Sequence, residues 1–282
     1  MFTHYSTDLE ITTVQAPQQF EPRRVADDTY LLGSWMPVPG IGVLPANAYL
    51  IRAAQPVLVD TGLAALRNDF VAALERLIDP AELRWIWITH MDADHVGNLT
   101  AVLERAPQAR IVTTYLGMGK MGLLGLPQDR ARLLNPGQTL DVGGRALTAL
   151  VPPSFDAPET TGLFDGRTRA LFSADSFGAV QPAIVDDAQQ IDAAALREGM
   201  KLWTSVDAPW LQLTDRALLR ATLGRVRDLQ PELILGSHLQ PARGITERLL
   251  QCLAEAADAP PFVGPDQAAL EAMMAAMHAG AA

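Results

Sequence analysis

The sequence predicts an α/β protein that folds as a four-layer αββα sandwich. Its 282 residues are 49% hydrophobic, which suffices for one large domain or two small ones. Segments typical of strands and then of helices follow one another along the chain, and this order occurs twice. Two such rounds favour two sheets with helices outside them over a single doubly wound sheet.

The first round follows a polar, irregular segment, residues 1–27, which is expected to form a strap along the surface. Residues 36–45 are rich in proline and glycine and predict a loop, and residues 65–78 have the apolar spacing of an amphipathic helix. Asn98 is a suitable N-cap for a helix over 99–104. Short apolar runs predict strands at 30–35, 47–51, 56–60, 84–89 and 110–114.

The second round follows residues 117–136, which are rich in Gly, Met and Leu and predict a flexible cover or short helices. Hairpins are predicted at 138–147, with a Gly-Gly turn, and at 162–173. Three prolines and a glycine mark 259–265 as a linker. Helices are predicted at 190–204, 214–229 and 245–257, with a strand at 232–237. The predicted organisation is a strap at 1–27, a main domain at 28–258, and a linker with a C-terminal helix at 259–282.

Composition excludes several classes of function. The net charge is −10 and the basic residues are scattered, which argues against binding to nucleic acid. No apolar run is long enough to cross a bilayer, and the N-terminus does not resemble a signal peptide, so a cytoplasmic protein is expected. The single cysteine, Cys252, excludes an internal disulfide and a cysteine-rich zinc site.

The predicted strand at 84–89 leads into four potential metal ligands within six residues: His90, Asp92, Asp94 and His95. Alternate residues of an extended segment point the same way, so His90 and Asp92 can face one metal ion. Asp94 and His95 lie where the chain begins to turn and can face a second ion. The segment therefore predicts a site for two metals.

Two further potential ligands also follow apolar strands. Asp175 comes after the second hairpin, and His238 comes after the strand at 232–237. A carboxylate such as Asp175 has two oxygens and can bridge two ions. Histidine is scarce, and His4 and His278 lie in terminal segments where we expect them to be solvated. The candidate ligands are thus three histidines and three carboxylates.

The pattern His-x-Asp-x-Asp-His at 90–95, preceded by Asp-Thr-Gly at 60–62 and followed by Asp175 and His238, resembles the metallo-β-lactamase superfamily. The resemblance covers roughly residues 28–245. A carboxylate at Asp92, where the superfamily usually has histidine, is typical of the flavodiiron branch and its flavin-free oxygen-binding relatives, although these usually carry Glu. Residues 46–51 and 171–178 and the Gly-Ser-His sequence at 236–238 agree with that branch.

The resemblance implies a ligand set. The first metal takes His90, Asp92 and the bridging Asp175, and the second takes Asp94, His238 and Asp175, with His95 as ligand or near neighbour. One family histidine is absent, because no histidine occurs between His95 and His238. Phe155 takes the position of the missing histidine and would line the pocket. Asp156 is either a substitute ligand or a loop cap. Asp60 is either a hydrogen-bond acceptor behind a histidine ligand or a turn residue.

The donors are rich in oxygen and include no thiolate, which favours two irons, with manganese and zinc as alternatives. The resemblance implies a di-iron centre that binds or reduces oxygen or nitric oxide. The chain is too short to add a flavin domain, so electrons are expected from a separate donor. The alternatives are a metallo-hydrolase that acts on an ester, lactone, thioester or phosphoester through a metal-bound hydroxide, and a degenerate binding module without catalysis. The C-terminal helix suggests a homodimer.

Overall fold

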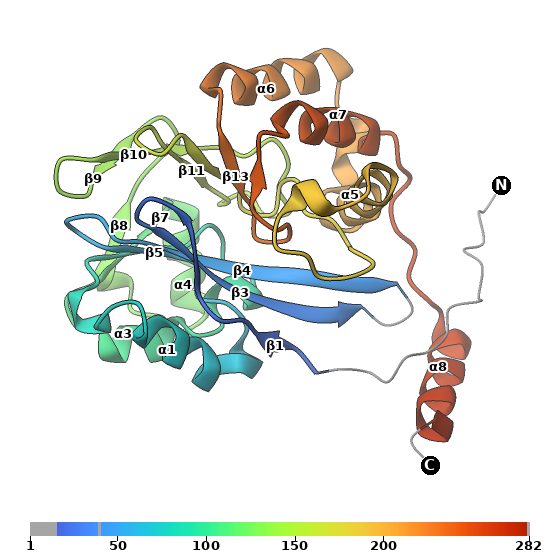
Figure 1. Cartoon of the computed structure of the whole chain (residues 1–282), viewed down its shortest axis with the longest axis horizontal. Coiled ribbons are helices and arrows are strands. Elements are labelled where there is room, and N and C mark those ends of the chain that lie inside the picture. The colour runs from blue at the N-terminus through green and yellow to red at the C-terminus, as the bar shows by residue number, and fades with distance from the viewer. Residues whose placement is uncertain (1–15, 39–40, 281–282) are drawn as a thin grey trace.

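The computed structural model describes residues 16–38 and 41–280 of the chain. They form two β-sheets packed face to face between two layers of helices (Figure 1). This arrangement confirms the predicted α/β sandwich. Among the described residues, no helix is both long enough and apolar enough to span a membrane.

The first sheet contains eight strands in the order β1-β3-β4-β5-β6-β7-β8, with β2 paired to β3. The strands from β5 to β8 are parallel, which brings their carboxyl ends to one edge of the sheet. The strands are β1 (Gln18–Gln19), β2 (Arg23–Ala26), β3 (Thr29–Val38), β4 (Gly42–Ile51), β5 (Val57–Val59), β6 (Trp85–Trp87), β7 (Arg110–Thr113) and β8 (Ala131–Leu133).

The second sheet contains six strands in the order β14-β13-β12-β11-β10-β9. Its two hairpins were predicted, and β12 and β13 are parallel neighbours, so the turns after them lie side by side. The strands are β9 (Thr139–Asp141), β10 (Ala146–Leu150), β11 (Gly162–Asp165), β12 (Ala170–Phe172), β13 (Leu233–Leu235) and β14 (Ala242–Arg243).

The helices cover the outer faces of both sheets. In Figure 1, α1 and α3 lie against the first sheet, and α5, α6 and α7 lie against the second, while α8 stands apart from the sandwich. The helices are α1 (Arg67–Glu75), α2 (Ala93–Val96), α3 (Leu99–Arg105), α4 (Tyr115–Leu123), α5 (Ala193–Asp207), α6 (Arg216–Leu229), α7 (Thr246–Ala256) and α8 (Gln267–Gly280). Leu270 and Met274 of α8 are exposed, and a homodimer contact through this helix stays a prediction.

Side chains alternate between the two faces of each sheet, so the apolar residues of one strand pack partly between the sheets and partly against the outer helices. In β12, Ala170 and Phe172 point into the core between the sheets, and Leu171 points outward to the helices. In β5, Val57 and Val59 likewise point inward, and Leu58 points outward to α1 and α3. Each sheet is therefore buried on both faces, which explains why its strands read as continuous apolar runs.

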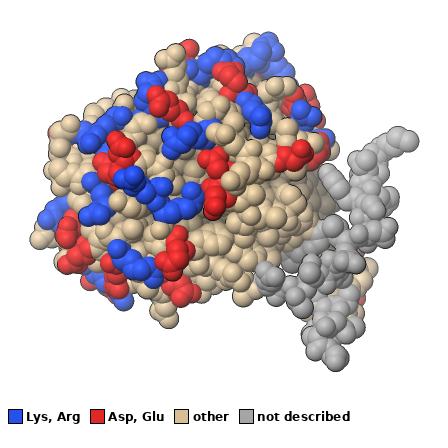
Figure 2. Space-filling view, viewed as in Figure 1, with Lys and Arg blue, Asp and Glu red and all other residues tan. Residues whose placement is uncertain are grey.

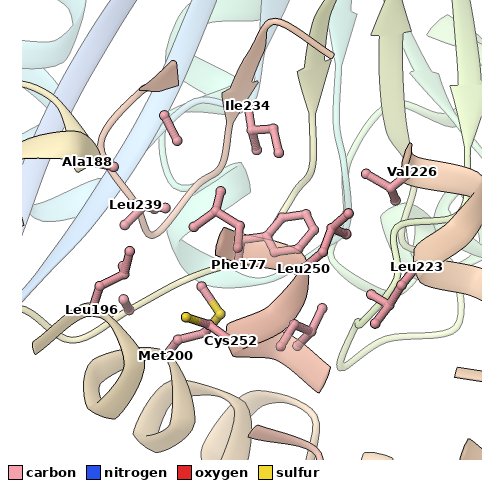
Figure 3. Close-up of a cluster of buried hydrophobic side chains, with 14 of the residues drawn as sticks. Phe177, Ala188, Leu196, Met200, Leu223, Val226, Ile234, Leu239, Leu250 and Cys252 are labelled. Atoms are coloured by element: carbon pink, nitrogen blue, oxygen red, sulfur yellow. The ribbon is translucent and has the colours of Figure 1, made fainter. Parts of the chain in front are cut away.

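The outer layer of the second sheet is a continuous apolar cluster. Figure 3 shows Leu196 and Met200 of α5, Leu223 of α6 and Leu250 of α7 around Phe177 and Ile234. Cys252 lies buried in the same cluster. Because Phe177 follows Asp175 by two residues, this packing fixes the turn that carries Asp175.

Three local predictions need correction. Residues 36–45 do not form a loop, because β3 and β4 continue through most of this stretch as a long hairpin. Pro45, which lacks an N–H, is tolerated because it lies on the part of β4 beyond the end of β5. Within the predicted strap of residues 1–27, residues 16–27 supply β1 and β2, and residues 1–15 lie outside the described part of the chain. Asn98 precedes α3, but its side chain donates to the Thr61 and Leu63 carbonyls and does not cap the helix.

Charged side chains are mixed on the surface. On the face shown in Figure 2, Lys and Arg are interspersed with Asp and Glu and form no basic stripe. A face of this kind offers no continuous track for a phosphate backbone. The picture agrees with the scattered basic residues of the sequence.

Candidate metal centre

The first group of ligands lies after β6. His90 follows the strand, and the chain then enters the short helix α2, which carries Asp94 and His95. Asp92 occupies the N-cap position of α2, but its side chain accepts no capping hydrogen bond. Its carboxylate is therefore free to act as a ligand.

The second group comes from the other sheet. Asp175 follows β12 and His238 follows β13, and these two strands are neighbours. The Asp175 turn holds Ala174 at φ 49° and Phe177 at φ 67°, both in the left-handed region that non-glycine residues seldom adopt. Such strain costs about 1–3 kcal/mol per residue, persists only where packing enforces it, and clusters at functional sites.

Asp175 lies at the centre of the histidines. Its Oδ2 is 3.4 Å from His90 Nε2, whereas its Oδ1 is 3.1 Å from His95 Nε2 and 3.4 Å from His238 Nε2. The two oxygens of one carboxylate thus face two different sets of ring nitrogens. This is the geometry expected of a carboxylate that bridges two metals.

Each side of Asp175 has its own group of donors. On one side, His90, Asp92 and Asp156 bring their ligand atoms within 4.8 Å of one another. On the other side, Asp94, His95 and His238 do the same, with Asp94 Oδ2 at 3.5 Å from His95 Nε2 and 3.3 Å from His238 Nε2. The structure therefore brings together every metal ligand that the sequence predicted.

The buried atoms at the centre have no hydrogen-bond partners among the described residues. They are His90 Nε2, His95 Nε2 and Asp175 Oδ1. Buried polar atoms are normally satisfied, so unpaired ones in both groups of donors indicate places for cations. The donor set, imidazole nitrogens and carboxylate oxygens, fits metal ions.

The opposite nitrogens of the imidazole rings face acceptors. His95 Nδ1 donates to Asp60 Oδ2 at 2.9 Å, and His238 Nδ1 donates to the Pro45 carbonyl at 2.7 Å. Asp60 also accepts from the N–H and the hydroxyl of Thr89, both at 2.8 Å. These bonds favour the tautomers that leave both Nε2 atoms free, so Asp60 acts behind His95 and outside the ligand groups.

The buried charges depend on one another. Burial alone would raise the pKa of Asp175, but His238, His95 and His90 hold it well below its usual range. Burial likewise opposes charge on His238, yet Asp175 and Asp94 raise its pKa to about 9. A metal ion that binds here must compete with protons for the imidazole nitrogens.

A family model described as the metallo-beta-lactamase superfamily matches residues 41–238, which include all of these ligands. The match covers more than half of the chain. The chain belongs to the metallo-β-lactamase superfamily.

Within the superfamily, the chain is similar to the core of flavodiiron proteins. Rubredoxin oxygen:oxidoreductase from Desulfovibrio gigas superposes with a TM-score of 0.74 and 21% identity, over 84% of this chain and 62% of that one. A fragment of the putative diflavin flavoprotein A 5 from Nostoc sp. PCC 7120 superposes with a TM-score of 0.71 and 20% identity, over 87% of this chain and 98% of the fragment. Identities at this level establish the fold.

Curated sequences support the same branch. The type A flavoprotein fprA of Rhodobacter capsulatus is 33% identical over 137 residues, 47% of this chain and 31% of that protein. The putative diflavin flavoprotein A 2 of Nostoc sp. is 31% identical over 134 residues, 47% of this chain and 23% of that protein. The alignments thus span less than a third of these relatives.

The loop that in this superfamily branch is expected to carry a histidine brings Asp156 to the site and turns Phe155 aside. Asp156 Oδ1 is 3.7 Å from His90 Nε2. The ring of Phe155 packs against Trp210 at 5.1 Å between centroids, and Trp210 Nε1 donates to the Phe155 carbonyl. Phe155 thus packs against Trp210, and its role in lining the pocket stays a prediction.

Two residues of α5 also lie at the site. Trp203 packs on His238 with 4.4 Å between ring centroids, and its Nε1 donates to the Asp175 carbonyl. Asp207, the last residue of α5, forms a group with Asp156 and Asp175, and burial together with Asp175 raises its pKa to about 8. Asp207 ends a helix and does not follow a strand, so the pattern of a ligand after an apolar strand, which revealed the other candidates, does not include it.

Proposed function

We propose that this chain holds a carboxylate-rich binuclear metal centre, a di-iron site, that binds or reduces oxygen or nitric oxide. The observation that carries the proposal is the position of Asp175, whose two oxygens face separate donor groups. The relatives support the choice of ligand. One of them, from Moorella thermoacetica, is named nitric oxide reductase and is 25% identical over 174 residues, 61% of this chain and 44% of that protein.

The proposed ligands follow from the two groups. The first metal would be held by His90, Asp92 and Asp156, the second by Asp94, His95 and His238, and Asp175 would bridge them. Four carboxylates and three imidazoles form a set that suits iron or manganese, although zinc competes for any such site. Asp156 thus replaces the absent histidine with an oxygen donor.

Iron bound in both positions would supply two adjacent electrons for a small diatomic ligand. The protein's own part is to shape the space and hold the ligands. Trp203 places apolar surface beside His238, and restricting the space favours a small ligand over a bulky one. Asp60 keeps the proton of His95 on Nδ1, away from the metal. A separate electron donor is part of the proposal.

The test is anaerobic reconstitution with ferrous iron, followed by metal analysis and visible spectra during exposure to oxygen or nitric oxide. About two irons per chain and a spectral change with either gas are expected. Asp175→Asn should retain less iron, whereas Asp69→Asn, an exposed change on α1, should behave as the wild type. Two bound irons with no response to either gas would overturn the proposal, and ester or lactone hydrolysis by zinc-loaded protein would then favour the hydrolase.

A further inference from the structure

We infer that Asp207 is an additional metal ligand, supplied by α5 to the Asp156 side of the centre. The inference rests on the proposed binuclear site and adds a residue to it. One carboxylate oxygen each from Asp156, Asp175 and Asp207 lies within 4.8 Å of the other two. The three residues come from separate segments, so their approach is a product of the tertiary structure.

The neighbours of Asp207 are themselves placed at the metal. Asp156 Oδ1 and Asp175 Oδ2 lie 3.7 Å and 3.4 Å from His90 Nε2, on the side of the first donor group. Asp207 therefore approaches that group from the helical layer outside the second sheet. A cation between these oxygens would be within reach of the Asp207 carboxylate of the helical layer, of the Asp156 and Asp175 carboxylates, and of the His90 imidazole.

Three carboxylates whose oxygens lie within 4.8 Å of one another repel each other unless a proton or a cation lies between them. Asp207 forms no ion pair or hydrogen bond through its carboxylate with a described residue, and neither Lys nor Arg joins the group. Buried charges are normally paired or bound to metals. Independently, His90 Nε2, from a fully buried side chain, has no hydrogen-bond partner among the described residues and lies on the Asp156 side of the centre. This atom distinguishes the group from an ordinary acidic patch.

The location of Asp207 on its helix has no local explanation. An aspartate at the last position of an α-helix faces the negative end of the helix dipole, which is unfavourable. The helix is held firmly in place, because Gly199 lies directly against the Val180 carbonyl and Trp203 donates to the Asp175 carbonyl. The fold thus presents Asp207 to the site at an energetic disadvantage that a bound cation would offset.

Charge predicts the consequence for the metals. With Asp207, the carboxylates number five: Asp92, Asp94, Asp156, Asp175 and Asp207. Their summed charge of −5 exceeds the +4 of two ferrous ions and is exceeded by the +6 of two ferric ions. Asp207 therefore favours the ferric state, and its neutralisation should raise the midpoint potential of the centre.

The experiment compares iron-reconstituted wild type with Asp207→Asn and with Asp228→Asn, which removes the same charge from an exposed position on α6. Chelator competition should show at least about tenfold weaker binding of one iron in Asp207→Asn, the loss typical of a removed metal-site carboxylate partner. Redox titration should show a higher potential. Asp228→Asn should match the wild type in both measurements.

Thermal unfolding of the metal-free proteins separates ligation from a structural role. Because Asp207→Asn keeps the shape and removes a carboxyl group that lies against Asp156 and Asp175, the metal-free variant should unfold at or above the wild-type temperature. If the variant binds two irons with unchanged affinity and potential, Asp207 is not a metal ligand, and the proposed binuclear site still stands. A marked loss of metal-free stability would assign Asp207 to structure, and a wild type that binds no iron would overturn the binuclear site as well.

Discussion

Asp60→Asn tests how the protein prepares His95 for metal. The Asp60 carboxylate accepts three hydrogen bonds, two from Thr89 and one from His95 Nδ1, each between 2.8 and 2.9 Å. Asparagine offers one oxygen, and if that oxygen keeps the Thr89 N–H, the amide nitrogen faces the imidazole. His95 would then move its proton to Nε2, the atom that points at the metal.

The expected cost is a fall in metal affinity of about 10- to 100-fold, the usual effect of losing a hydrogen-bond partner behind a ligand. That range equals about 1.4–2.7 kcal/mol. Competition with a calibrated chelator measures the affinity, and nitrogen NMR of labelled histidine reports the tautomer. Asp69→Asn is the control. Unchanged affinity with the proton still on Nδ1 would refute this account of Asp60.

Three further predictions concern stability. Asp165 is fully buried against Arg145, and the hydrogen bonds from Arg145 hold the pKa of Asp165 below its usual value although burial opposes this. Asp165→Asn should lower the free energy of unfolding in urea by about 3–5 kcal/mol. The stabilisation from this ion pair should be lost as the pH falls below about 4. Gly199→Ala places a methyl group 2.0 Å from the Val180 carbonyl oxygen and should lower the free energy of unfolding by about 1–3 kcal/mol. Gly224→Ala on α6 places the methyl group in open space and should raise the free energy of unfolding by about 0.5–1 kcal/mol. Equal effects of the two substitutions would contradict the packing. Removing metal with a chelator should lower the melting temperature, since metal present at 100 times its Kd contributes about 2.7 kcal/mol.

The periodicity of the sequence was a good guide to the second half of the fold. The helices predicted at 190–204, 214–229 and 245–257 correspond to α5, α6 and α7 with ends shifted by at most a few residues. The prediction was wrong at 36–45, because proline is usually read as a strand breaker. Proline disrupts a strand only where a backbone N–H is needed to pair with a neighbouring strand, and Pro45 lies beyond the end of β5.

The candidate ligands were recognisable because they follow apolar strands. His90 and His238 come after β6 and β13, and the carboxyl ends of such strands gather at one edge of a sheet. Asp207 escaped this reasoning because it ends a helix whose approach to the site depends on Gly199 and on the apolar cluster of Figure 3. Its role could not be read from the local pattern.

By itself, the sequence determined the layers and the ligand types, because the spacing of apolar residues fixes which face of each element is buried. It also determined that no histidine stands between His95 and His238. Only the tertiary structure decided that the two oxygens of Asp175 face different histidines, that Asp60 accepts a hydrogen bond from His95, and that Asp207 approaches Asp156. These relations join segments far apart in the chain, and their geometry is set by how the two sheets and α5 pack, which local periodicity does not encode.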